Sequence, residues 1–525
     1  MKRFATIVAG LPLALSLSLG MVACDKQTET VDPEPKPEAA EPEAAEPVWP
    51  DEEFRATRPT PKPIKDTPIP EIETFELSNG MKVYLVQQKT LPTVYMLFDW
   101  EIGEVNDPKG KTGLGSLCAD LLDEGTKSKD KAAFSAAQAD HAVTVSSSGG
   151  GESSFMTVRT LERELPAALD LAAEMLLEPG LREDDFERLR KQKKARLEQS
   201  KGSASSIAYR LFPSLIWGSK HAYGKLETAE SLDKVTLADC GKWAKKLKPD
   251  GAELWVVGKI TKEKLIAEFD SRFAKWKGKA PKPVKLKDAK PAKGTVFFVD
   301  VPGSAQSQIL IGHPGPQRDV PDYEATQLMA AILGGSFSSR INMNLREDKG
   351  WAYGARGSFR YSRAGSYFTA GSSVRTDTTG GAVREIFKEI EIMRSTDPTQ
   401  VEVTREQQGA LLSLPAEFAT ATRTLFEFRG LTYYGLPLDW HAGHQERMRA
   451  VDIQAIRTAA ETHLQATDHV VLVVGDGSVV LEELEAIAAE GMFGKGGIQY
   501  LDPDGNPISK PEKADKPEKS AKPQK

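Results

Sequence analysis

The stretch that decides the fold runs from Asp107 to Thr126 and reads DPKGKTGLGSLCADLLDEGT. Its central part, around Cys118, is predicted to be helical. Positions 116, 119 and 120 have the spacing of three and four residues that places side chains on one face of a helix. Two metal ligands and a catalytic base on one helix require this spacing. The positions hold Ser116, Ala119 and Asp120, so the spacing is present with only one side chain, that of Asp120, that could bind a metal.

The motifs on either side of this stretch follow a definite order. Residues 75–86 predict a β-hairpin with Asn79-Gly80 as its turn. A Ser- and Gly-rich segment at 146–155 follows the stretch, then an apolar helical pattern at 163–177 and a basic helix at 186–198. The hydrophobic run at 254–258 predicts a buried strand that closes this half of the chain.

The second half of the chain has the same order of predicted elements as the first: strands, then helices, then a closing hydrophobic strand. It begins with the strand predicted at 295–300 and ends with the one predicted at 470–476. A helix predicted at 322–333 stops at Gly334-Gly335. The order of elements predicts an α+β fold of two homologous lobes, each an antiparallel sheet packed with helices.

These motifs together resemble the pitrilysin/insulinase family of peptidases, whose zinc helix carries H-x-x-E-H. The resemblance covers most of residues 72–500. It implies a zinc site at Ser116, Ala119 and Asp120 that has been lost. Serine cannot replace a zinc-binding imidazole, alanine leaves no carboxylate to act as a base, and Asp120 alone is one weak oxygen ligand.

The family's last zinc ligand is a glutamate on the later helix, which corresponds here to residues 186–198. The position expected for it holds Ala195 or Arg196, and Glu198 is out of step. A cation at position 196 would repel zinc. The resemblance therefore implies that this chain has no catalytic residues and no zinc of its own.

The second half keeps the family's other active-site motif. Residues 334–353 read GGSFSSRINMNLREDKGWAY. The resemblance implies that Arg346 and Tyr353 bind substrate and stabilise the oxyanion of the tetrahedral intermediate. Arg346 is expected in the last turn of a helix that ends at Gly350, and Tyr353 at the start of the next strand. The alternative is that Arg346 pairs with a surface acid such as Glu347 and that Tyr353 is half-buried packing.

The N-terminus carries an export signal. Lys2 and Arg3 precede an apolar run that ends in Ala23-Cys24, which predicts a secretory signal. The small residue before Cys24 resembles a lipoprotein cleavage box, which implies lipidation of Cys24 and anchoring to a bacterial membrane facing the periplasm. The alternative is a plain signal peptide with an incidental cysteine.

Composition sets the remaining limits. The net charge of −6 excludes a globally basic nucleic-acid binder. Residues 25–53 carry eleven acidic and two basic side chains and cannot form a core. The predicted domains are a signal peptide (1–24), a disordered acidic tether (25–70), an N-terminal peptidase-like domain (71–276), a flexible basic linker (277–294), a C-terminal peptidase-like domain (295–500) and a disordered Lys/Pro tail (501–525).

Three further features are weaker signals. Cys118 and Cys240 lie in helical patterns and are expected to be buried free thiols, although an exported location allows a disulfide. His441 and His444 have a metal-like spacing, but a structural role is expected. Residues 146–151 are expected to form either an edge strand beside which a peptide can lie or a mobile hairpin turn.

The resemblance leads to one main functional hypothesis and two rivals. The main hypothesis is a zinc-free subunit of a heteromeric peptidase, which binds unfolded peptide and contributes Arg346 and Tyr353 to the zinc site of a homologous partner. The first rival is an inactive structural or peptide-binding protein of the same fold. The second is a self-sufficient metallopeptidase with altered ligands.

Overall fold

The computed structural model describes residues 62–511, and within them residues 64–511 belong to one compact unit. The predicted signal peptide, Cys24 and most of the acidic tether lie outside the described residues, as does the Lys/Pro tail beyond residue 511. No helix within residues 62–511 has the length and apolar character needed to cross a membrane.

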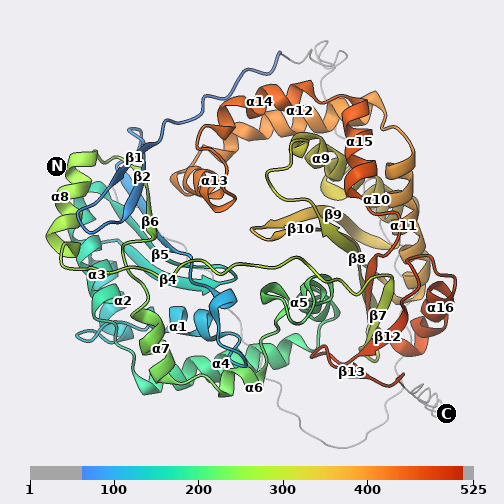
Figure 1. Ribbon diagram of the computed structural model, residues 1–525, viewed down its shortest axis with the longest axis horizontal. Coiled ribbons are helices and arrows are strands. Elements are labelled where there is room, and N and C mark those ends of the chain that lie inside the picture. Colours follow the sequence, from blue (N-terminus) through green and yellow to red (C-terminus); the bar gives the residue numbers. More distant parts are fainter. Residues whose placement is uncertain (1–61, 512–525) are drawn as a thin grey trace, which may run out of the picture. The chain divides into compact units, whose positions relative to one another are not determined.

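Two sheets of matching topology build the described chain (Figure 1). The first has the strand order β1-β2-β6-β3-β5-β4. Its strands are β1 (Glu73–Glu76), β2 (Lys82–Gln87), β3 (Thr93–Trp100), β4 (Thr144–Gly150), β5 (Ser153–Leu161) and β6 (Ala252–Gly258). The predicted hairpin is confirmed, because β1 and β2 pair antiparallel around the Asn79-Gly80 turn.

The second sheet has the order β13-β12-β7-β11-β8-β10-β9. Its strands are β7 (Thr295–Asp300), β8 (Gln306–Gly315), β9 (Ala352–Ser362), β10 (Gly365–Arg375), β11 (Val470–Gly475), β12 (Gly497–Leu501) and β13 (Pro507–Ile508). The run β7-β11-β8-β10-β9 repeats β2-β6-β3-β5-β4 strand for strand. The repeat confirms the predicted α+β fold of two homologous lobes.

Both sheets are mixed, which corrects the expectation of antiparallel sheets. The closing strand β6 runs parallel to β2, and β11 runs parallel to β7. After a long helical excursion, β6 inserts between β2 and β3, and β11 inserts between β7 and β8. A connection of that length allows a parallel neighbour, whereas a short hairpin does not.

Helices account for most of the rest of each lobe. The first lobe contains α1 (Leu114–Leu122), α2 (Lys131–Asp140), α3 (Leu165–Leu177), α4 (Glu183–Ser200), α5 (Ala204–Trp217), α6 (Ala229–Asp233), α7 (Leu237–Ala244) and α8 (Lys262–Phe273). The second contains α9 (Tyr323–Ala330), α10 (Arg340–Asn342), α11 (Thr379–Ser395), α12 (Gln400–Glu417), α13 (Ala421–Tyr433), α14 (Trp440–Ala450), α15 (Ile453–His463) and α16 (Gly477–Ala489). Two π-helical turns, Ala331–Gly335 and Met343–Asp348, lie in the second lobe.

Each lobe sends one helix to the sheet of the other lobe. Helix α13 packs its Leu425, Phe428 and Leu431 on the first sheet, against Trp255 and its neighbours. Helix α5 of the first lobe packs in the same way on β7, β8 and β11 of the second sheet. Both faces of each sheet are therefore covered, which explains why β3 and β11 are buried almost throughout instead of alternating.

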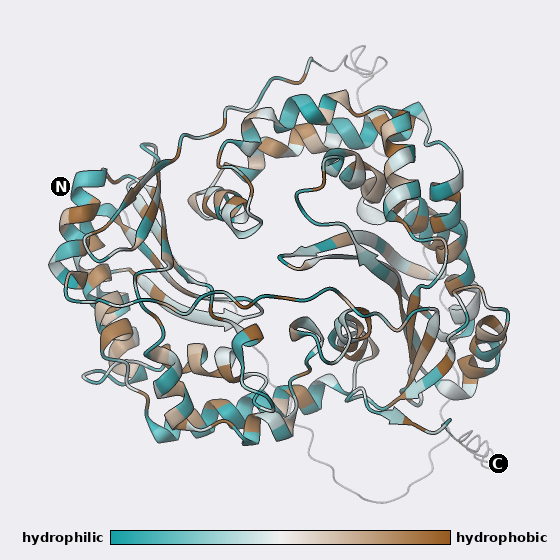
Figure 2. Cartoon of the chain, viewed as in Figure 1, coloured by the Kyte–Doolittle hydropathy of each residue, from teal (hydrophilic) through white to brown (hydrophobic). Residues whose placement is uncertain are grey.

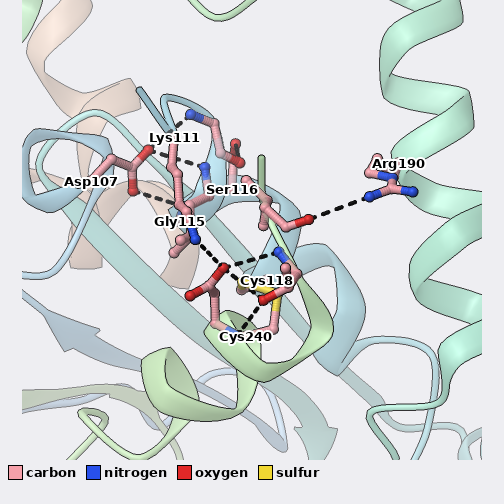
Figure 3. The surroundings of a disulfide bond; sticks show 12 residues. Asp107, Lys111, Gly115, Ser116, Cys118, Arg190 and Cys240 are labelled. Atoms are coloured by element: carbon pink, nitrogen blue, oxygen red, sulfur yellow. Dashed lines mark hydrogen bonds and ion pairs between the residues drawn. A yellow bond between two sulfur atoms is a disulfide. The ribbon is translucent and has the colours of Figure 1, made fainter. Parts of the chain in front are cut away.

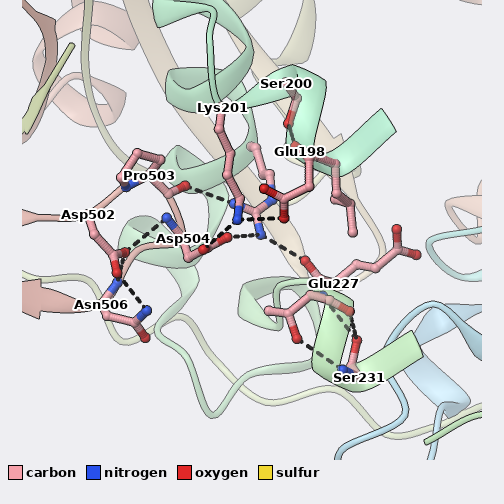
Figure 4. A network of polar contacts seen from close by, with 12 residues as sticks. Glu198, Ser200, Lys201, Glu227, Ser231, Asp502, Pro503, Asp504 and Asn506 are labelled. Atoms are coloured by element: carbon pink, nitrogen blue, oxygen red, sulfur yellow. Dashed lines mark hydrogen bonds and ion pairs between the residues drawn. The ribbon is translucent and has the colours of Figure 1, made fainter. Parts of the chain in front are cut away.

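Two further segments tie the lobes together. The basic linker lies along α5, where the Lys290 and Ala292 amides donate to the Trp217 and Leu215 carbonyls at 3.1 and 3.2 Å. The loop between β12 and β13 contacts the first lobe through Lys201, whose ammonium lies 2.8 Å from Asp504 (Figure 4). These contacts make the second lobe part of the environment of α4 and α5.

Candidate functional site

Helix α1 carries the degenerate zinc motif, and its start is fixed by a buried carboxylate. Asp107 accepts hydrogen bonds from the amides of Gly113, Leu114 and Gly115 at 2.8, 3.1 and 3.0 Å. Gly113 has φ 94°, a left-handed conformation that glycine adopts without strain. The capping explains why a nine-residue helix begins at Leu114.

The three motif side chains offer nothing that would bind zinc. The Ser116 hydroxyl donates to the Gly113 carbonyl of its own helix at 3.2 Å. Ala119 is completely buried, and a side chain on Gly149 would meet its Cβ at 2.9 Å. Burial raises the pKa of Asp120, while the nearby cations Lys193 and Arg196 oppose that rise.

Helix α4, which carries the last zinc ligand in the family, faces α1 with positive charge. The Lys193 ammonium lies 3.1 Å from the carboxylate of Glu227, and both side chains are about one-fifth exposed. Burial raises the pKa of Glu227, and Lys193 opposes the rise. Helix α4 is mostly hydrophilic (Figure 2), and only Phe186 among its eighteen residues is buried.

This arrangement disfavours a divalent cation for electrostatic reasons. Lys193 and Arg196 stand beside Asp120, and a cation there would meet two like charges. Within residues 62–511, no group of three or more His, Cys, Asp or Glu side chains is placed to hold a metal ion.

A disulfide joins the degenerate helix to α7, which corrects the expectation of free thiols. Cys118 and Cys240 are bonded, with their Cα atoms 4.9 Å apart (Figure 3). The Lys111 ammonium and the Asp239 carboxylate form an ion pair next to it, at 2.5 Å. The helical patterns indicated that each thiol is buried, but 122 residues separate the two, and only the tertiary fold brings them together.

Arg346 and Tyr353 lie where the sequence predicted, at a helix end and the next strand. Arg346 is in the π-helical turn Met343–Asp348, and Tyr353 is the second residue of β9. Gly350 between them has φ 64°, in the left-handed region typical of a helix terminator.

Both side chains of this pair are accessible. The Arg346 guanidinium stacks on the Phe337 ring at 4.6 Å and pairs with Glu347 at 3.2 Å, while 40% of the side chain stays exposed. Tyr353 is 91% exposed, so the alternative of half-buried packing is wrong for the tyrosine. Across the described chain, no hydrogen bond or ion pair joins either residue to Ser116 or Asp120.

Comparison with known proteins identifies the fold and the family. The family model "Insulinase (Peptidase family M16)" matches residues 82–227, and the model "Peptidase M16 inactive domain" matches residues 234–410. The chain belongs to peptidase family M16. The model named for an inactive domain matches part of the second lobe, whereas the lost zinc residues lie within the range matched by the other model.

The curated M16 relatives are distant but cover much of the chain. The Helicobacter pylori protein "Non-peptidase homolog YmxG" is 21% identical over 75% of this chain and 92% of its own. The Streptomyces coelicolor protein "Uncharacterized zinc protease SCO5738" is 22% identical over 57% of this chain and 67% of its own.

Solved structures share the M16 fold. A peptidase M16 inactive domain from Pseudomonas fluorescens has a TM-score of 0.70 at 22% identity, covering 77% of this chain and 98% of that one. A chain of Complex III2 from Candida albicans has a TM-score of 0.65 at 14% identity, covering 78% of this chain and 97% of that one. The periplasmic protease PqqL from Escherichia coli has a TM-score of 0.66 at 14% identity; the match covers 82% of this chain but 48% of PqqL.

The Ser- and Gly-rich segment at residues 146–151 lies largely in an edge strand, which was one of the two structures predicted for it. β4 pairs only with β5, at the end of the first sheet. Its free edge is partly covered, because the Val145 amide donates to Gln138 at 2.7 Å and the Ser147 amide donates to Asp123. Beyond these bonds a side chain at Gly150 would meet open space.

The two histidines with metal-like spacing have structural environments. His444 lies 3.0 Å from Glu324 and stacks on Trp440. Burial lowers the pKa of His441 to about 4, so its ring is neutral near pH 7. The ring lies 3.9 Å from the Glu427 carboxylate, beyond hydrogen-bond distance.

One cavity in the second lobe was not predicted from the sequence. It has a volume of about 500 Å³ and is lined by residues that include Arg318, Tyr323, Glu427 and Tyr434. These residues come from a loop and from several helices, and no motif or spacing connects them. Only the fold assembles this cavity.

Proposed function

We propose that this M16 chain is the zinc-free subunit of a heteromeric peptidase. It binds peptide and contributes Arg346 and Tyr353 to the zinc site of a homologous partner. The observation that carries the proposal is the exposure of this pair. The Tyr353 phenol is 91% exposed and the Arg346 side chain 40% exposed, so both contribute little to the core and are available to a second molecule.

The chemistry of peptide hydrolysis suits these two side chains. Attack by a zinc-bound water on the peptide carbonyl develops negative charge on the carbonyl oxygen. A guanidinium and a phenol that donate hydrogen bonds to this oxygen stabilise the transition state, typically by about 3 kcal/mol per donor. The partner supplies the zinc and the base, which Ser116 and Ala119 cannot replace.

The environment of Arg346 supports a functional role. π-Helical turns are rare and occur frequently at functional sites, and Arg346 lies in one. Its ion pair with Glu347 is between exposed groups and therefore weak. A substrate carbonyl or a partner carboxylate can displace Glu347 at little cost.

Peptide binding beside β4 is restricted to one end of the strand. Gln138 and Asp123 already occupy the Val145 and Ser147 amides. An extended substrate could add to this edge only at its Gly150 end, where a side chain would meet open space, because Gly149 is closely packed against Ala119. The proposed substrates are therefore short unfolded segments.

We also propose export and membrane anchoring through a lipid on Cys24, with the folded part facing the periplasm. The disulfide between Cys118 and Cys240 supports an oxidising compartment. Metabolic labelling with a radioactive fatty acid, compared between the wild type and Cys24→Ala, tests the anchor.

Reconstitution with a partner tests the main proposal. The chain is mixed with an H-x-x-E-H homologue from the same genome, and cleavage of a quenched fluorescent peptide is measured. We expect Arg346→Ala to lower the kcat of the mixture by about 10²- to 10³-fold. Arg375→Ala is the matched control, because Arg375 is an exposed arginine that forms an ion pair with nearby Asp377. Equal rates with wild type and Arg346→Ala would refute the proposal.

The rival role of an inactive scaffold is favoured by the covered edge of β4. It predicts that the chain binds its partner but leaves the partner's cleavage rate unchanged. The second rival, a self-sufficient metallopeptidase, requires stoichiometric zinc in the purified chain and cleavage that a chelator stops. Metal analysis of the chain alone separates that case from the other two.

A further inference from the structure

Arg318 has an unusual environment on the loop between β8 and α9. Its guanidinium carbon lies 3.3 Å from the ring centroid of Tyr323, 4.6 Å from that of Trp440 and 5.8 Å from that of Tyr434. Its Nη1 atom is buried and makes no hydrogen bond. Within residues 62–511, no carboxylate forms an ion pair with Arg318.

Such an arrangement holds a cation in place without neutralising it. The aromatic rings fix the plane of the guanidinium by stacking. A buried N–H group without an acceptor is unfavourable, and a ligand that supplies the acceptor removes this cost. The N–H groups of arginine match the two oxygens of a carboxylate.

The guanidinium lies in the walls of two neighbouring cavities. One has a volume of about 500 Å³ and the other about 470 Å³, and both are also lined by Tyr433 and Tyr434. These volumes are within the range of sites that bind small organic ligands or short peptide segments. Arg318 therefore borders both cavities.

The other arginines of these cavities are already paired. Arg429 lies 2.7 Å from Asp99 and donates to the Ser153 hydroxyl at 3.0 Å. Arg363 pairs with both Glu101 and Glu152. Among the arginines lining these cavities, Arg318 alone forms no ion pair with a carboxylate within residues 62–511, although its charge acts on Glu427 of the same cavity and opposes the rise of that group's pKa. Arg318 is therefore the cation best placed to pair with a ligand.

The larger cavity also has an acidic end. Glu427 lies in its wall, close to Glu417, and burial together with Glu417 raises the pKa of Glu427 to about 7. This carboxyl disfavours a second negative charge on the ligand and can accept an N–H group. Phe426, Leu431 and Leu436 line the same cavity and suit an apolar side chain.

We infer that the cavity beside Arg318 binds the free C-terminus of a peptide. The terminal carboxylate pairs with Arg318, the last side chain lies against the apolar wall, and backbone N–H groups face Glu427. A ligand with one carboxylate, an apolar group and N–H donors matches all three features. The site is built by this chain alone, so it goes beyond the proposed pairing with a zinc subunit.

Binding to the isolated full chain tests this inference by fluorescence anisotropy. The probe is a labelled octapeptide that ends in leucine with a free carboxylate, compared with the same peptide amidated at its C-terminus. We expect the free acid to bind at least tenfold more tightly, because the amide lacks the charge that pairs with Arg318. Equal dissociation constants for the acid and the amide would overturn the inference.

Variants of the chain test whether Arg318 causes the preference for the free acid. Arg318→Gln should reduce the preference for the free acid to less than twofold, while Arg375→Gln should keep it in full. An unchanged preference in Arg318→Gln would overturn the assignment. Thermal melting checks that the variant folds, and the acid and amide comparison on the wild type decides the question if it does not.

A third peptide separates a C-terminal carboxylate from a side-chain carboxylate. It is amidated and has glutamate as its last residue. We expect it to bind like the leucine amide, and binding as tight as the free acid would refute recognition of the C-terminus. Peptide cleavage with a zinc subunit is measured in a separate experiment. If the isolated chain does not prefer the free acid, the test of the proposed pairing with that subunit is unaffected.

Discussion

At the scale of single residues, the cations Lys193 and Arg196 disfavour zinc beside Asp120. They lie beside Asp120, and Lys193 forms an ion pair with Glu227. Restoring the residues of helix α1 would leave these two charges in place. The loss of the zinc site is therefore a property of two helices, α1 and α4.

We predict that zinc affinity returns only when both helices are changed. A variant with Ser116→His, Ala119→Glu and Asp120→His should bind zinc weakly. Adding Arg196→Glu should raise its affinity at least tenfold, because the change removes a cation and supplies a carboxylate. Competition with a zinc-binding dye measures both constants.

Lys191→Glu on the same triple variant is the control. It makes the same change of charge at an exposed position of α4. An equal gain from Lys191→Glu would mean that net charge alone controls zinc affinity.

At the scale of elements, helix α1 is held by contacts from outside itself. Nine residues are too few for a helix to be stable alone in water. Asp107 caps its first turn, Gly149 of β4 packs on Ala119, and the disulfide joins Cys118 to α7. The disulfide thus fixes a helix that has lost the cross-link that zinc provides in the family.

We predict that the double variant Cys118→Ala/Cys240→Ala is less stable than the oxidised wild type by about 2–5 kcal/mol. The bond closes a loop of 122 residues and restricts the unfolded chain. Urea denaturation followed by circular dichroism measures the difference. A reductant should destabilise the wild type and leave the double variant unchanged, and coincident curves for all four samples would contradict the prediction.

At the scale of the whole molecule, the lobes are joined by α5 and α13, each of which packs on the sheet of the other lobe. A buried carboxylate also joins them. Glu152, at the turn between β4 and β5, accepts hydrogen bonds from the hydroxyls of Tyr223 and Tyr433. It also forms an ion pair with Arg363 of the second lobe. This carboxylate connects the first sheet with α13 and with the β9–β10 turn.

We predict that Glu152→Ala loosens the contact between the lobes. Removing a buried carboxylate leaves Arg363 without its buried partner, and the expected loss of stability is about 3–5 kcal/mol. Hydrogen exchange measured by mass spectrometry should rise in β4, β5 and α13. Glu101→Ala removes the more exposed partner of Arg363 and should cost less than about 1 kcal/mol. Similar exchange in both variants would argue against a special role for Glu152.

The positions of many elements could be predicted from the sequence, because their signals are local. The Asn79-Gly80 turn, the helix that starts near Pro166, and the strands at 295–300 and 470–475 all formed as expected. The missing histidines and glutamate of α1 are also visible in the sequence. The absence of a functional group is a chemical fact that does not depend on the fold.

The tertiary structure alone decided which segments far apart in the sequence contact one another. The pairing of Cys118 with Cys240, the cover of β4 by Asp123 and Gln138, and the unpaired guanidinium of Arg318 involve residues that no local pattern connects. The sequence by itself determined the fold class and the loss of zinc ligands, because periodicity and residue type act locally. Only the tertiary structure decided which surfaces and cations stay free, because that depends on what the rest of the chain covers.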